Sequence, residues 1–184
     1  MKLLLSKIPR AQTLSVLTLL MASNWVTGCT STPPLKTQAY AKLSHKRTFE
    51  APFPDVWQAI ERSLQNYKVL KQDSDDKTDG VPSRKASSGV IQTDWVYGQS
   101  RDKYQEYSIN GSPRKIELPA RFKYQIKAKS ILGGTQVTIE TSEEVEKVHS
   151  DGSPAAYSST DNPDPSRASE LLDKIQLNLL SKNH

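Results

Sequence analysis

The sequence has a single cysteine, Cys29, in 184 residues, and it has three histidines. One cysteine excludes an internal disulfide, a paired redox motif and any zinc site built from several cysteines. His45, His149 and His184 are far apart in the chain, so they provide little material for a metal centre. We therefore expect no metal and no cofactor.

Motifs of catalysis are also missing from the sequence. There is no Gly-x-Ser-x-Gly nucleophile elbow, no His-Glu-x-x-His motif and no glycine-rich phosphate cradle. Asp73, Asp75, Asp76 and Asp79 resemble a loose calcium ligand set, but Lys77 interrupts it and the glutamate that closes such a loop is lacking. A solvated acidic loop is the favoured interpretation. We expect no catalytic residues, and a protein that is not an enzyme.

The N-terminal apolar stretch, Leu14–Met21, is too short to cross a bilayer, which takes roughly 20 residues. It follows a basic segment, and the two together are typical of a removable secretory signal. Removing residues 1–28 takes away Lys2, Lys7 and Arg10 and no acidic residue, so the net charge falls from +5 to +2. Such a small excess of positive charge does not favour nucleic acid as a partner, and we expect none.

The predicted signal ends in Val26-Thr27-Gly28-Cys29, which resembles the lipobox of bacterial lipoproteins. In that family the cysteine sulfur receives a diacylglyceryl group, a peptidase cleaves before the cysteine, and the new amino group is usually acylated, for example by palmitate. The resemblance implies cleavage between Gly28 and Cys29 and lipidation of Cys29, the alternative being a buried, inert thiol. Several acyl chains give stable membrane anchoring, whereas one alone is marginal. Thr30 after the cysteine, in place of Asp, implies the outer membrane of a Gram-negative bacterium, with the domain facing the periplasm.

The rest of the chain divides into a tether and one domain. Residues 29–47 include a polar, proline-containing run without apolar periodicity, which predicts a flexible tether. Residues 48–184 are then expected to form a single domain with the element order strand, helix, four strands, helix. The first strand is expected at 47–50, and further strands at 67–70 and 90–97, while 73–88 and 150–165 are expected to be loops.

Two helices frame the predicted domain. The first opens at Ala51-Pro52-Phe53-Pro54-Asp55, and the second opens at Asp164-Pro165-Ser166. The predicted fold class is α+β, in the order β-α-β-β-β-β-α, with an antiparallel sheet packed by a long C-terminal helix. Trp57 and Trp95 are expected in the core, and the alternative for Trp95 is stacking on a ligand.

Alternating side chains on either side of Gly133-Gly134 predict a β-hairpin in which these glycines form a type I′ turn. Ala128 would then lie opposite Ile139 on an apolar face, and Glu143, opposite Tyr124, is the one misfit. The other face would be charge-paired, through Lys127–Glu140, Lys123–Glu144 and Arg121–Glu146. We expect this face to be solvated, the alternative being a surface for an anionic ligand.

The C-terminal helix has more apolar residues than one face requires. Its core stripe is predicted to comprise Ala168, Leu171, Leu172, Ile175 and Leu179. Leu177 and Leu180 lie outside this stripe. They either deepen the core or form a surface for a protein partner.

The layout resembles the helix-grip domains of the BamC (NlpB) family over roughly residues 48–182. The residues that carry the resemblance are Phe53-Pro54-x-x-Trp57 on the first helix, Gly89-Val90-Ile91-x-Thr93-x-Trp95 on a strand, and the terminal amphipathic helix. Members of that family are lipoprotein subunits of the outer-membrane β-barrel assembly machinery.

Three functions are open on this evidence, and the third, a periplasmic enzyme, would need a catalytic polar triad that the sequence does not show. The first is a non-enzymatic envelope lipoprotein that binds a protein partner, as an accessory of outer-membrane β-barrel assembly. The second is a lipid-anchored carrier that encloses an apolar ligand between sheet and helix. A large apolar cavity would favour the carrier, whereas a filled core with an exposed apolar patch would favour protein binding.

Overall fold

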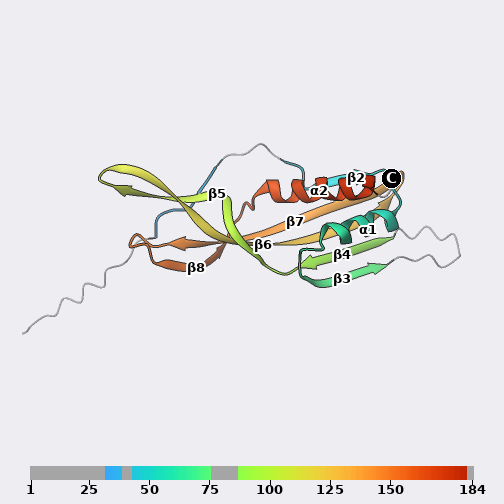
Figure 1. Ribbon diagram of the computed structural model, residues 1–184, viewed down its shortest axis with the longest axis horizontal. Helices are drawn as coiled ribbons and strands as arrows, with labels where there is room; N and C mark the ends of the chain where they lie inside the picture. Colours follow the sequence, from blue (N-terminus) through green and yellow to red (C-terminus); the bar gives the residue numbers. More distant parts are fainter. Residues whose placement is uncertain (1–31, 39–42, 76–86, 182–184) are drawn as a thin grey trace, which may run out of the picture.

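The computed structural model describes residues 32–38, 43–75 and 87–181. These residues form one eight-stranded antiparallel sheet, and two helices, α1 and α2, cover part of one of its faces (Figure 1). The C-terminal helix packs on the sheet, so the predicted α+β fold class is confirmed. The predicted signal peptide, its cleavage site at Gly28 and the lipidation site at Cys29 lie outside the described residues.

The elements have the following bounds in chain order. They are β1 (Lys36–Thr37), β2 (Lys46–Phe49), α1 (Phe53–Ser63), β3 (Val69–Asp75), β4 (Ser88–Thr93), β5 (Val96–Ile109), β6 (Ser112–Ile131), β7 (Gly134–Val148), β8 (Pro154–Ser159) and α2 (Pro165–Leu180).

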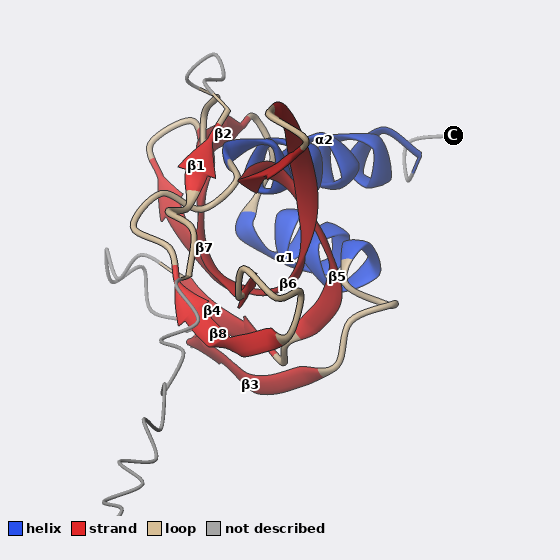
Figure 2. Ribbon diagram, turned by 90° about the vertical axis from the view of Figure 1, so that its left-hand side faces the viewer, coloured by secondary structure: helices blue, strands red, loops and turns tan. Residues whose placement is uncertain are grey.

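The central strand of the sheet is β6, which is 20 residues long. Its first half pairs with β5 and its second half with β4, while β7 runs along its other edge. β1 extends the sheet beyond β5, and β3 extends it beyond β4. β7 pairs on its far side with β2 near one end and with β8 near the other. Seen from one end, the sheet curves around the two helices (Figure 2).

Both helices begin where the sequence predicts. Pro54 lies in the first turn of α1, where a missing N–H costs nothing, and Asp55 stands at the positive end of the helix dipole. The Asp164 side chain caps α2 by accepting a hydrogen bond of 2.9 Å from the Ser166 N–H. The helices are joined near their C-terminal ends, where Lys174 Nζ donates to the Ser63 carbonyl oxygen at 2.7 Å.

The main core lies between the helices and the sheet. Trp57 and the whole predicted α2 stripe pack into it, with Leu179 partly buried at its margin. Trp57 lies over Gly89, where a Cβ would approach the indole ring to 2.4 Å. A second, smaller core comprises Leu118, Ala120 and Val145.

The β6–β7 turn differs from the prediction. Its two-residue loop is Leu132-Gly133, and Ala128 lies opposite Val137, so the predicted pairing with Ile139 is wrong by two residues. Gly133 and Gly134 both have positive φ angles, +86° and +153°, which favour glycine. Gly134 is a glycine for another reason: a Cβ there would lie 2.1 Å from the Phe49 carbonyl oxygen. Because the error is an even number of residues, each side chain keeps its predicted face.

The sheet contains strand segments that were not predicted from the sequence. β5 and β6 extend into a long hairpin closed by Asn110-Gly111, whose φ angles are +51° and +79°. An Asn-Gly dipeptide is the strongest short sequence signal for such a hairpin. β8 lies within 150–165, which was expected to be a loop. The strand expected at 67–70 begins at Val69 and continues to Asp75, and the one expected at 90–97 divides into β4 and β5.

The described part of the predicted tether lies against the sheet. Lys36 and Thr37 pair with Tyr104 and Lys103 of β5. Gln105 Nε2 donates a hydrogen bond of 2.6 Å to the Pro33 carbonyl oxygen, and Thr32 Oγ1 lies 2.9 Å from His149 Nδ1. Leu35 packs against the smaller core. Residues 32–38 are therefore part of the folded domain.

Candidate functional site

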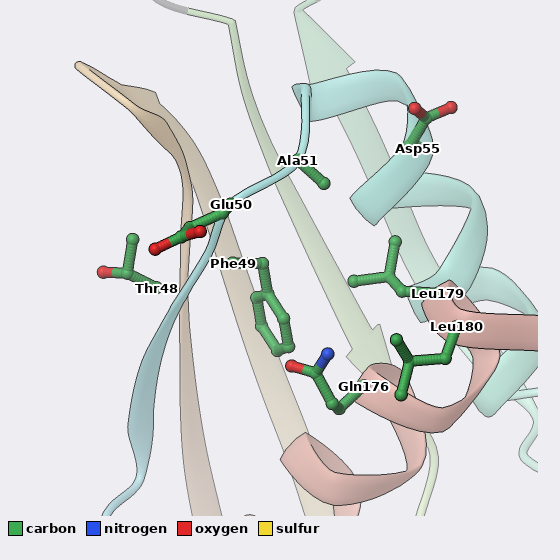
Figure 3. A pocket seen from close by; sticks show the side chains of 8 residues that line it. All are labelled: Thr48, Phe49, Glu50, Ala51, Asp55, Gln176, Leu179 and Leu180. Atoms are coloured by element: carbon green, nitrogen blue, oxygen red, sulfur yellow. The ribbon is translucent and has the colours of Figure 1, made fainter. Parts of the chain in front are cut away.

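A surface groove of about 340 Å³ lies where the end of β2 and the start of α1 meet the last turns of α2 (Figure 3). Its lining residues are Thr48, Phe49, Glu50, Ala51, Asp55, Gln176, Leu179 and Leu180. We refer to it as the α2 groove.

The backbone on one side of the α2 groove is held firmly. Thr135 Oγ1 donates a hydrogen bond of 3.0 Å to the Ala51 carbonyl oxygen. Phe49, which is 2% exposed, is anchored in the main core, and its carbonyl is the group packed against Gly134. In Figure 3 the Phe49 ring points toward α2, and Leu179 and Leu180 project from α2 on the opposite side.

Both leucines singled out in the sequence are on the surface, and Leu180 lines this groove. Leu177 is 65% exposed and Leu180 is 53% exposed. They do not deepen the core, so of the two interpretations of these residues the structure retains the surface one. Leu132 in the β6–β7 turn is also fully exposed, and a shallow hollow beside that turn shares Glu50 and Ala51 with the α2 groove.

The charged residues that line the α2 groove are both acidic. Glu50 stands at the end of β2 and Asp55 in the first turn of α1, and no lysine or arginine is among the lining residues. Next to the groove, Arg47 is held by Asp173 through a 2.7 Å ion pair. The groove therefore combines two leucines of α2, Leu179 and Leu180, with a mostly polar and negatively charged surface.

A second cluster of polar residues lies inside the protein, and sequence reasoning missed it. Glu143, expected as a misfit opposite Tyr124, lies opposite Phe122 and is 2% exposed. Its carboxylate lies 2.6 Å from Lys103 Nζ and 3.6 Å from Arg167 Nε, and it also accepts a hydrogen bond from the Asp164 N–H at 3.1 Å. We call the set Asp102, Lys103, Glu143, Asp164 and Arg167 the buried charge cluster.

An irregularity in β5 explains how adjacent residues enter this cluster. Neighbouring side chains in a regular strand point to opposite faces. The β5–β6 pairing passes from Gln99–Pro119 to Tyr104–Glu117, so several β5 residues stand opposite the single residue Leu118. Such a bulge redirects side chains. It places both Asp102 and Lys103 inside, where Lys103 Nζ contacts Asp102 Oδ1 at 2.9 Å.

The buried charge cluster joins elements that are distant in sequence. Its members come from β5, β7 and the start of α2. Arg167 also lies over the Phe122 ring at 3.8 Å and donates to the Gln99 carbonyl oxygen at 3.3 Å. Because the five residues are at most 4% exposed, a solute has no access to them. We interpret the cluster as a structural connection and not as a reaction site.

Trp95 is not in the core, so the expectation that it packs there is wrong. It is half-buried on the outer face of the sheet, where Arg121 and Lys123 lie 4.8 and 4.6 Å from its ring. Arg121 also forms an ion pair of 2.6 Å with Glu144 instead of the predicted Glu146. Hydrogen bonds to Glu144 and then to Tyr97 raise the pKa of Arg121.

The rest of this outer face agrees in part with the predicted charge pairing. Lys127 and Glu140 form the expected ion pair, at 2.6 Å, although they are diagonal neighbours and not directly opposite. Hydrogen bonding from Lys68 lowers the pKa of Asp94, the residue before Trp95. The cations of this surface are thus largely engaged by the protein's own acids and aromatic rings.

Other kinds of site were sought in the described part of the chain. No group of three or more His, Cys, Asp or Glu residues in it is arranged to hold a metal ion. Neither of its helices has the length and apolar character needed to cross a membrane. Asp73 and Asp75 lie on the exposed strand β3, while Asp76 and Asp79 are outside the described residues.

Comparison with protein-family models gives no match to the chain, and comparison with curated proteins gives none either.

Proposed function

We propose that this protein is a non-enzymatic lipoprotein of the Gram-negative outer membrane, anchored through Cys29, that binds a protein partner in the periplasm through the α2 groove. The observation that carries the proposal is the exposure of Leu180, which lines the groove next to Leu179, together with the exposure of Leu177 on the same helix. Apolar side chains gathered at a concave surface are typical of protein-binding sites.

The position of the groove supports this proposal. Residues 32–38 run beside β5 and reach His149 at the end of β7, whereas the α2 groove lies by Gly134 at the start of β7. A strand of 15 residues spans roughly 45 Å at about 3.3 Å per residue. A chain anchored just before Thr32 would therefore hold the groove well away from the membrane.

The packing of the core favours protein binding over the carrier function. Side chains of α1, α2 and the sheet fill the space between helix and sheet, and Val56, Ile60, Leu172 and Ile175 are fully buried there. The α2 groove, by contrast, is open at the surface and has acidic residues at its rim. An apolar small molecule binds better in an enclosed apolar cavity than in such an open groove.

The lining of the groove indicates the chemistry of its partner. The leucine side chains of the groove can pack against an apolar residue of the partner. Glu50 and Asp55 can attract a lysine or arginine next to that residue. A protein segment with an apolar residue flanked by basic residues fits both. The resemblance to BamC makes the subunits of the β-barrel assembly machinery the first partners to test.

A photo-crosslinking residue at position 180 tests this function in envelopes of the native host. We expect crosslinks to a defined envelope protein, and we expect Leu180→Glu to remove at least 90% of its co-purification. The melting temperature should stay within about 2 °C, because Leu180 is mostly exposed.

The matched control is Leu70→Glu, since Leu70 is 55% exposed on β3, away from the groove. It should leave co-purification unchanged. Equal loss from both variants, or a steep fall in melting temperature for Leu180→Glu, would contradict the assignment of the groove. Turnover of a periplasmic substrate by the purified protein would contradict the non-enzymatic function.

A further inference from the structure

We infer that the tip of the β5–β6 hairpin, residues 107–115, contacts the anionic phospholipid surface in which the protein is anchored. This inference deepens the proposed function and rests on it, because it requires the lipid on Cys29. It adds a second, non-covalent contact that would fix how the domain is oriented on the membrane.

The direction of β1 leads the chain toward this hairpin. β1 is antiparallel to β5, with Lys36 opposite Tyr104 and Thr37 opposite Lys103. Followed toward the N-terminus, the chain therefore proceeds along β5 in the direction of its turn. Along this path Gln105 Nε2 donates a hydrogen bond to the Pro33 carbonyl oxygen, and Thr32 Oγ1 contacts His149 Nδ1.

The distances allow the anchor and the hairpin tip to meet one surface. Pro33 and Thr32 are held by Gln105 and His149, and Cys29 precedes Thr32 by three residues, which span at most about 11 Å. Ile109 lies four residues beyond Gln105, or about 13 Å along the strand. The acylated cysteine can thus approach the level of the tip, and the short connection prevents it from lying far away.

The residues at the tip have the chemistry of a membrane-interface contact. Tyr107 is 43% exposed and Ile109 is 51% exposed. Tyrosine and apolar side chains are favoured at the boundary between headgroups and acyl chains. Arg114 lies opposite Tyr107, and Lys115 follows it. From Tyr107 to Lys115 the hairpin has these two bases and no acid. Glu106 stands opposite Lys115 but forms an ion pair with Lys36, so the tip keeps a positive charge that matches an anionic headgroup layer.

The apolar surface extends from the tip to the base of the hairpin. A groove of about 360 Å³ opens there, and Tyr107, Ile116 and Val148 contribute to its lining together with Pro33. In Figure 1 the hairpin extends beyond the part of the sheet that the helices cover, at the end opposite the C-terminal end of α2. The membrane contact and the α2 groove would therefore face opposite ways.

The test uses the full chain, expressed in a Gram-negative host, purified in its mature form and reconstituted into vesicles of phosphatidylethanolamine and phosphatidylglycerol. Ile109→Cys is labelled with an environment-sensitive fluorophore, and nitroxide lipid serves as the quencher. The matched probe is Leu132→Cys, at the exposed turn at the other end of β6. We expect quenching at position 109 to be at least twofold stronger than at position 132. Quenching that is equal at the two positions would overturn the inference.

Charge reversal tests the headgroup contact separately. Arg114→Glu combined with Lys115→Glu should reduce the quenching at position 109 to the level seen at position 132. The control combines Lys71→Glu with Lys129→Glu, which changes the net charge equally at exposed positions away from the tip, and it should have no effect. If reversal at the tip has no effect either, the hairpin does not recognise anionic lipid.

The same samples separate this inference from the proposed function. Intact mass shows whether the chain carries acyl groups, and flotation shows whether it is bound to the vesicles. A chain that floats and has acyl mass, but shows no quenching at position 109, overturns only the hairpin contact. A chain without acyl mass overturns the lipid anchor, and the hairpin contact with it.

Discussion

Lys103 is 3% exposed, and its ammonium group contacts the carboxylates of Asp102 and Glu143. A charge in such a position is tolerated only because partners replace the water it loses. Arg167 supplies the second positive charge, against three acids in the cluster. Removing one member leaves another charge buried without compensation, so these residues should be among the least replaceable in the protein.

Lys103→Met should lower the free energy of unfolding by about 3–5 kcal/mol, the range found when one partner of a buried ion pair is removed. Methionine keeps most of the side-chain volume, so the loss reports the missing charge and not a cavity. Urea unfolding followed by circular dichroism measures it.

Lys127→Met is the matched control, because Lys127 forms an ion pair of similar length, 2.6 Å, with Glu140 on the surface. Exposed pairs contribute less than about 1 kcal/mol. If the two variants cost the same, Lys103 is not a buried charge on which the fold depends.

The junction between β2 and the β6–β7 hairpin is the tightest backbone approach beside the α2 groove. Gly134→Ala would place a methyl group 2.1 Å from the Phe49 carbonyl oxygen, and the surrounding atoms are backbone. We expect it to lower the free energy of unfolding by about 1–3 kcal/mol, as overpacking does. It should also reduce partner binding, because Phe49, Glu50 and Ala51 line the groove. Chemical unfolding and co-purification measure the two effects.

Gly98→Ala is the control for this substitution, since a Cβ at position 98 in β5 has no atom within 4 Å. It should change stability by no more than about 0.5 kcal/mol. A Gly134→Ala variant as stable as Gly98→Ala would mean that β2 does not pack against the hairpin as described.

The helices were predictable from sequence because their signals are local. The helical spacing of the α2 stripe and the Asp164-Pro165-Ser166 start both depend on a few neighbouring residues, and both are confirmed. The β6–β7 register was not predicted correctly. Residue 134 is glycine because the Phe49 carbonyl of β2, which is distant in sequence, packs against it. The sequence around Gly133-Gly134 contains no sign of that contact.

The candidate site was predictable only in part, for a similar reason. Leu177 and Leu180 stand out as surplus to a helical stripe, and the structure places both on the surface. The other wall of the groove comes from the β2–α1 connection, which no periodicity relates to α2. The buried charge cluster depends on the β5 bulge. From the sequence alone, the polar run Ser100-Arg101-Asp102-Lys103 would be expected on the protein surface.

The molecule as a whole has two functional ends in our proposal. The N-terminal segment and the β5–β6 hairpin lie at one, and the α2 groove lies at the other, with β6 and β7 running between them. Changes at one end should leave the other unaffected, because sites this far apart without shared partners act independently.

Cys29→Ala should abolish lipidation and leave a precursor that is uncleaved or mislocalised, since Cys29 is the only thiol in the chain. Detergent partitioning and intact mass measure the outcome. The purified variant should retain the melting temperature of the mature protein, because the packed elements from β1 to α2 all follow Cys29 in the chain. A mature chain that starts at Thr30 or later, without acyl mass, would show that the protein is not a lipoprotein.

In the proposed lipid-anchored state copies of the protein would be crowded on a membrane, and the strands at the edges of the sheet bear on whether they associate. β1 has two residues, β2 has four and β8 has six, so each offers few unpaired backbone groups to another chain. The longest of these outer strands, β3, is exposed throughout and carries Lys71, Asp73 and Asp75. Short or charged edges resist pairing with the edges of neighbouring molecules. At these four edges, copies anchored as we propose should therefore remain separate, without joining into continuous sheets.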